Sequence, residues 1–181
     1  MENKRLESGP SYDGVARTLH WLTVMLIAAQ FIIGWVMPDV HKDTKVEGLI
    51  WWHLFVGGAL LLTIFIRIVW RATHKPPPSK LTPLLRFASS STHFLLYVVL
   101  VITPLLGWGN ASSRGWSVRI FDILPLPALT AEGSPAGHAM GDIHGIMAWV
   151  LLALIILHVS SALFHRFVLK DDVMERMIPP R

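Results

Sequence analysis

Four stretches of this 181-residue chain are almost continuously apolar, with polar residues between them. Each stretch has about the 20 residues that an α-helix needs to cross a hydrocarbon core of about 30 Å, the third only if Ser89–Thr92 are included. In lipid, a helix satisfies its own backbone hydrogen bonds. The pattern therefore predicts four membrane-spanning helices, at residues 17–37, 49–70, 90–109 and 143–166.

Composition agrees with a membrane protein and with a single domain over residues 1–181. Hydrophobic residues make up 52% of the chain and charged residues only 15%. The first apolar stretch could also be read as a cleaved signal peptide, but it is longer than a typical signal core of about 7–15 residues and has no obvious small-residue cleavage site. We therefore expect an all-α, integral membrane four-helix bundle.

The basic residues predict how the bundle is oriented. With four spans, both termini and the connection between the second and third spans share one side. Cytoplasmic loops of membrane proteins are enriched in Lys and Arg. Both termini should therefore be cytoplasmic. That side would hold Lys4, Arg5, Arg17, Arg67, Arg71, Lys75, Lys80, Arg86, Arg166, Lys170, Arg176 and Arg181, against Lys42, Lys45, Arg114 and Arg119 outside.

Composition excludes sites that depend on cysteine and disfavours nucleic-acid binding. The chain has no cysteine, which excludes disulfides, thiolate metal sites, iron–sulfur clusters and covalent haem attachment. The net charge of +4 reflects membrane topology, and no basic-aromatic pattern for nucleic acid lies outside the membrane ends. The only long loop is 109–142, in which 116–129 could lie along the outer interface as a short amphipathic piece.

Histidines in the spans carry the candidate chemistry. His144 and His158 are fourteen residues apart, and His165 follows seven residues later. At about 100° per residue, all three lie on roughly one helix face, and the first two are about 21 Å apart along the axis. Ionisable residues inside a membrane are costly and mark functional sites by default.

The predicted spans place these histidines at two depths. The outer level holds His53 and His144, and the inner level holds His20 and His158, with His93 as a competitor. His165 falls at the cytoplasmic interface, whereas a solvated loop position is the simplest interpretation for His41, His74 and His138. Two facing histidines suit haem iron, because the porphyrin supplies the other four ligands. A structural zinc site would need four protein ligands at each level.

Neighbouring residues fit a cofactor at each level, although each has a plainer interpretation. Gly57 lies one turn from His53 and makes room for a flat macrocycle, or simply allows close helix packing. Arg67 lies fourteen residues after His53, where it could meet haem propionates or act as a cytoplasmic anchor. Trp51, Trp52, Trp108 and Trp116 are typical of an interfacial aromatic belt.

Several motifs together resemble the bacterial cytochrome b561 family. They are "RTLHWL" (17–22), "WWHLFVGG" (51–58), "RIVWR" (67–71), "IHG" followed by "LHVSSALFHRFVLKDD" (143–172), and the closing "ERMIPPR". The resemblance implies a four-helix bundle with two b-type haems in a bacterial inner membrane. By position, His20 and His158 would hold the cytoplasmic-side haem, and His53 and His144 the periplasmic-side haem. His93 would then have a supporting role.

The resemblance also implies a function, because the chain is similar in size to stand-alone members that oxidise superoxide outside and reduce ubiquinone in the membrane. Lys42 and Lys45 could attract superoxide, although the outer loops carry more acidic than basic residues. His165, with Lys170 and Asp171 beside it, is the natural proton donor for quinone.

Two other functions stay open at this point. The chain could be a haem subunit that passes electrons between quinone and a partner such as a hydrogenase or another redox protein. A histidine-relay transporter for protons or metal ions is a third reading, but it would also need intramembrane Asp or Glu, and the spans contain none. The sequence does not indicate an oligomeric state.

Overall fold

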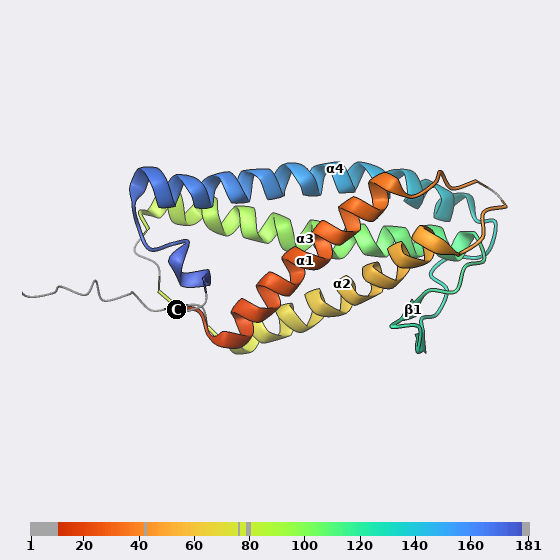
Figure 1. Cartoon of the computed structure of the whole chain (residues 1–181), viewed down its shortest axis with the longest axis horizontal. Coiled ribbons are helices and arrows are strands. Elements are labelled where there is room, and N and C mark those ends of the chain that lie inside the picture. Colours follow the sequence, from red (N-terminus) through yellow and green to blue (C-terminus); the bar gives the residue numbers. More distant parts are fainter. Residues whose placement is uncertain (1–10, 42, 76, 79–80, 179–181) are drawn as a thin grey trace, which may run out of the picture.

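The computed structural model describes residues 11–41, 43–75, 77–78 and 81–178, and it shows a bundle of four long helices (Figure 1). All four are long and apolar enough to cross a membrane, which confirms the integral membrane four-helix bundle. In the bundle, α3 packs along α4 and α1 along α2. The helices are α1 (Gly14–Val36), α2 (Gly48–Thr73), α3 (Pro83–Ser113) and α4 (Pro135–Phe164).

Two helices are longer than the apolar pattern predicts. Helix α3 covers residues 83–113 where the pattern predicts 90–109, and α4 begins at residue 135 where it predicts 143. His138 therefore lies in the first turn of α4, and its predicted loop position is wrong. Hydropathy marks only the part of a helix that lies in lipid, whereas proline at the first helical position and the Ser134 cap mark the true start of α4.

The long outer loop contains a small β ribbon in place of the predicted amphipathic piece. Strands β1 (Arg119–Ile120) and β2 (Leu124–Pro125) pair antiparallel. Phe121 and Asp122 turn the chain between them with φ of 51° and 58°. The ribbon lies against α2, where a Cβ at Gly58 would approach the Arg119 carbonyl oxygen to 3.4 Å. A glycine here lets the two backbones approach closely.

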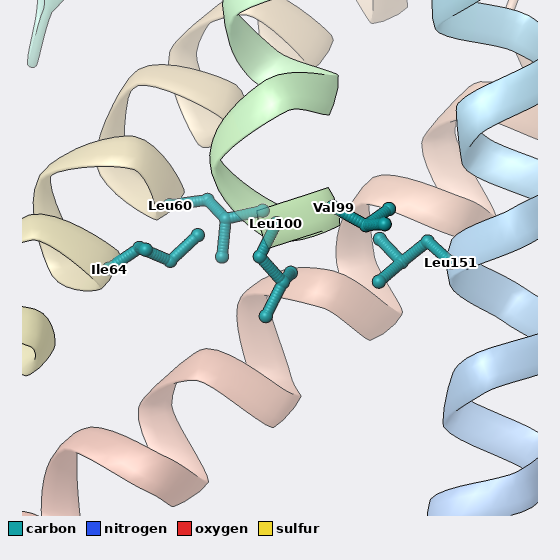
Figure 2. Close-up of a cluster of buried hydrophobic side chains, with 5 residues drawn as sticks. All are labelled: Leu60, Ile64, Val99, Leu100 and Leu151. Carbon is teal, nitrogen blue, oxygen red and sulfur yellow. The ribbon is translucent and has the colours of Figure 1, made fainter. Parts of the chain in front are cut away.

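An aliphatic cluster fills the middle of the bundle (Figure 2). It comes from α2, α3 and α4, and Leu151 lies seven residues from both His144 and His158. The cluster therefore separates the two histidine levels by a layer without ionisable groups. The buried members are Leu60, Ile64, Val99, Leu100 and Leu151.

The C-terminal segment folds back under the end of the bundle where α1 begins. After α4, the chain forms a π-helical turn, η1 (His165–Leu169), and a 3₁₀ turn, η2 (Glu175–Met177). The Trp21 indole donates to the Met177 carbonyl at 3.0 Å. The Arg176 guanidinium donates to two proline carbonyls of the α2–α3 linker, each at 2.9 Å.

These contacts place the start of α1, the α2–α3 linker and the C-terminal segment at one end of the bundle, as four spans require. Assignment of that end to the cytoplasm rests on the charge asymmetry and remains a prediction. Of the residues used for that prediction, Lys4, Arg5, Lys42, Lys80 and Arg181 lie outside the described residues.

Candidate cofactor sites

The outer site brings His53 of α2 against His144 of α4, with ring centroids 6.0 Å apart. The His144 Nδ1–H donates to the Thr103 backbone carbonyl at 2.8 Å, which leaves Nε2 as the free lone pair. In a histidine that binds a metal through one ring nitrogen, the other ring nitrogen is usually fixed by a hydrogen bond of this kind. The Nδ1 atom of His53 is buried and has no hydrogen-bond partner.

The inner site contains three histidines. The ring centroids of His20 and His158 are 6.3 Å apart, and those of His93 and His158 are 5.2 Å apart. The His93 Nδ1–H donates to the Ser89 carbonyl at 2.7 Å. The structure therefore brings together the predicted pair and its competitor.

A spacing of fourteen residues organises both levels on all four helices. It separates His20 from Gly34 on α1, His53 from Arg67 on α2, His93 from Gly107 on α3, and His144 from His158 on α4. The two glycines lie at the outer level and face its histidines: a Cβ on Gly107 would lie 3.0 Å from the His144 ring, and one on Gly34 would lie 3.7 Å from the His53 ring.

The donor set fits haem better than a bare metal ion. At each level two histidine rings lie close together, with centroids 6.0 Å and 6.3 Å apart, and histidine is a residue type that holds haem iron. Among the described residues, no group of three or more His, Cys, Asp or Glu side chains could hold a metal. A porphyrin supplies the four ligands that the protein lacks.

Arg67 occupies the inner level but contacts a histidine there. Its Nη2 donates to His20 Nδ1 at 2.9 Å, and its guanidinium lies 5.4 Å from the centre of the Tyr97 ring. Because arginine is only a donor, the neutral His20 ring in this contact carries its proton on Nε2. Ligation through Nε2 would move that proton to Nδ1, so Arg67 must release His20 when His20 binds a metal.

Other predicted site residues fall into different surroundings. Gly57 faces the side chain of Gln30, since a Cβ there would lie 3.0 Å from Gln30 Nε2. This contact fits close packing of α1 against α2, and a cofactor role for Gly57 remains a prediction. Lys45 is exposed in the α1–α2 loop, and Lys42 lies outside the described residues.

His165 forms a pair with Asp171, one of the two residues that the sequence placed beside it. His165 is 9% exposed, and its Nδ1 lies 2.6 Å from Asp171 Oδ2. The π-helical turn and the left-handed Lys170, with φ of 52°, bend the chain so that these two side chains meet. A carboxylate on Nδ1 leaves Nε2 free to accept and deliver a proton.

Sequence reasoning missed Gly34, Gly107 and the Thr103 carbonyl. The two glycines had a signal, because each lies fourteen residues after a histidine. The Thr103 carbonyl had none, since a backbone acceptor has no sequence signature and depends on how α3 packs against α4.

Comparison with known proteins now identifies the family. A family model described as prokaryotic cytochrome b561 matches residues 11–180. The chain belongs to the prokaryotic cytochrome b561 family. It is therefore a multi-pass membrane cytochrome of the b type that acts in electron transfer.

Curated relatives of this cytochrome match over nearly their full length. Cytochrome b561 homolog 2 of Escherichia coli (strain K12) is 28% identical over 171 residues, covering 92% of this chain and 90% of the relative. Cytochrome b562 of Cereibacter sphaeroides is 29% identical over 177 residues, covering 95% and 98%. The probable superoxide oxidase CybB of Yersinia pestis is 25% identical over 168 residues, covering 90% and 93%.

Proposed function

We propose that the chain binds two haems b and catalyses oxidation of superoxide by ubiquinone. The observation that carries the proposal is the pair of facing histidines at each end of the bundle, with an aliphatic layer between the two levels. Each bound haem would supply a one-electron carrier. His53 and His144 would hold the outer haem, and His20 and His158 the inner one.

The overall reaction balances two one-electron oxidations against one two-electron reduction. Two superoxide ions each lose one electron and become dioxygen, and one ubiquinone gains both electrons and two protons to become ubiquinol. Superoxide would meet the outer end of the bundle, near Lys45. A Yersinia pestis relative whose name specifies superoxide oxidase supports this choice of donor.

The inner end of the bundle holds His165, a side chain that can deliver the protons that ubiquinol formation requires. Asp171 holds His165 Nδ1, so that Nε2 can donate a proton to the reduced quinone and recover one from the cytoplasm. Asp171 is thus a positioning residue for His165.

The aliphatic core argues against the transporter alternative. The two histidine levels are about 21 Å apart along the helices, and Leu151 lies halfway between them. A proton or metal relay needs closely spaced polar groups, and this layer offers none among its clustered side chains.

A second candidate is a haem subunit that serves a redox partner. The observation that favours it is the tip of the β ribbon, where Ile123 is 83% and Leu124 58% exposed at the outer end. An exposed apolar tip can dock another protein or lie against lipid.

A reconstitution assay tests the proposal and separates it from this second candidate. We expect the purified protein, given a superoxide source, catalase and ubiquinone, to form ubiquinol without any partner protein. Superoxide dismutase should abolish that signal, because it removes the donor. If the haems stay oxidised under the superoxide flux yet are reduced by ubiquinol, the proposed reaction is wrong and the partner subunit is the better account.

A further inference from the structure

A basic cavity of about 40 Å³ opens at the inner end of the bundle, where α1 begins and α2 ends. Its walls include Asp13 before α1, Arg67, Trp70 and Arg71 of α2, Lys75 just after α2, and Tyr97 of α3. Apart from Arg67, which contacts His20, the proposed function uses none of these side chains.

The charges in this cavity leave two cations without partners. The Ala16 N–H, aided by the Trp70 indole N–H, holds the pKa of Asp13 below its usual range, so this carboxylate is ionised and its oxygens are occupied. Within the part of the chain that the structure describes, Arg71 and Lys75 form no ion pair. The cavity therefore presents uncompensated positive charge.

An apolar groove of about 320 Å³ adjoins the cavity on the surface of α2 and α3. Ile68, Ala72 and Tyr97 line it together with Arg71, so the cavity and the groove share Arg71 and Tyr97. Ile68 is 40% exposed on a face that looks toward lipid. A basic cavity that continues into an apolar groove has the shape of a site for an amphiphile with an anionic head.

The level of this site matches phospholipid headgroups. Helix α2 has 26 residues and is therefore about 39 Å long, which exceeds a hydrocarbon core of about 30 Å. Its last turn, with Arg71, then lies at the interface, and Lys75 lies just beyond it. Basic pockets between membrane helices on the cytoplasmic side are known to bind lipid phosphates.

We propose that Arg71 and Lys75 bind the phosphate of an anionic phospholipid from the inner leaflet, with one acyl chain along the groove formed by Ile68, Ala72 and Tyr97. Charge complementarity selects this occupant over ubiquinone, whose head is uncharged. The site goes beyond the proposed reaction, since its lipid neither donates nor accepts electrons.

Native mass spectrometry of the delipidated holoprotein tests the site. The double variant Arg71→Gln/Lys75→Gln should bind phosphatidylglycerol about 25-fold more weakly than the wild type, which corresponds to about 1 kcal/mol for each cation removed. Lys170→Gln is the matched control, because this exposed lysine lies at the same end but outside the cavity. It should bind phosphatidylglycerol like the wild type.

Further arms of the experiment distinguish the source of the phosphate and the alternative occupants. Phosphatidylcholine should bind much more weakly than phosphatidylglycerol, and inorganic phosphate at equal concentration should not compete. The proposal would be overturned if Lys170→Gln lost as much affinity for phosphatidylglycerol as the double variant, or if the two lipids bound equally well. It would also be overturned if inorganic phosphate or ubiquinone competed for the site, or if the double variant lost haem. An unchanged haem spectrum shows that the double variant is folded.

Discussion

Replacing His144 with alanine should lower the haem content of the purified protein from about two per chain to about one. His144 is positioned by the Thr103 carbonyl at 2.8 Å and faces His53 at a ring separation of 6.0 Å. Under the proposal, loss of either ring removes one of the two histidines that would hold the outer haem, and Gly107 provides no side chain that could replace it. His53→Ala should therefore have the same effect, measured as haem per polypeptide and as the reduced-minus-oxidised spectrum.

The inner ligands should form a second, distinct group. His20→Ala and His158→Ala should share a spectral loss that differs from the loss shared by His53→Ala and His144→Ala. His93→Ala is the decisive comparison, because its ring lies 5.2 Å from that of His158. It should keep both haems, with at most a shifted spectrum. Identical losses in His53→Ala and His158→Ala would refute the two levels, and loss of the inner haem in His93→Ala would refute the His20 assignment.

A second large effect should separate electron entry from proton delivery. Under a superoxide flux, His53→Ala and His144→Ala should lower the rate of ubiquinol formation at least 100-fold, because each variant removes the outer site at which electrons would enter. His165→Asn should leave haem reduction by superoxide at the wild-type rate but slow ubiquinol formation at least tenfold, because a general acid typically contributes about 10²–10⁴-fold.

Two further variants control this experiment. Asp171→Asn should slow ubiquinol formation less than His165→Asn does, and Asp171→Glu should restore part of the rate, as expected for a residue that acts through His165. His138→Ala should behave like the wild type, since His138 is exposed in the first turn of α4. Slowed haem reduction in His165→Asn would show that His165 supports structure or ligation and is not a proton donor.

The sequence predicted the four spans and the two histidine levels because both depend on simple periodicities. An apolar run of about 20 residues can satisfy its backbone in lipid only as a helix, and a spacing of fourteen residues returns a side chain to nearly the same helix face. His53 and His144 therefore meet at the outer level as depth predicts, and at the inner level His158 meets both His20 and His93, the two partners that depth left open.

Features that depend on packing could not be predicted in this way. The extra turns of α3 and α4 are not part of the apolar runs, so hydropathy does not mark them as helical. The β ribbon depends on Phe121 and Asp122 adopting positive φ, which no common turn motif announces at these residues. The contact of Arg67 with His20 arises from how α1 packs against α2.

Haem quantification of the wild-type protein tests the central claim most directly. A pyridine haemochrome assay combined with amino-acid analysis should give about two haems b per polypeptide, since two levels each offer a facing histidine pair. A value of one haem or none per polypeptide in fully loaded, folded protein would contradict the account.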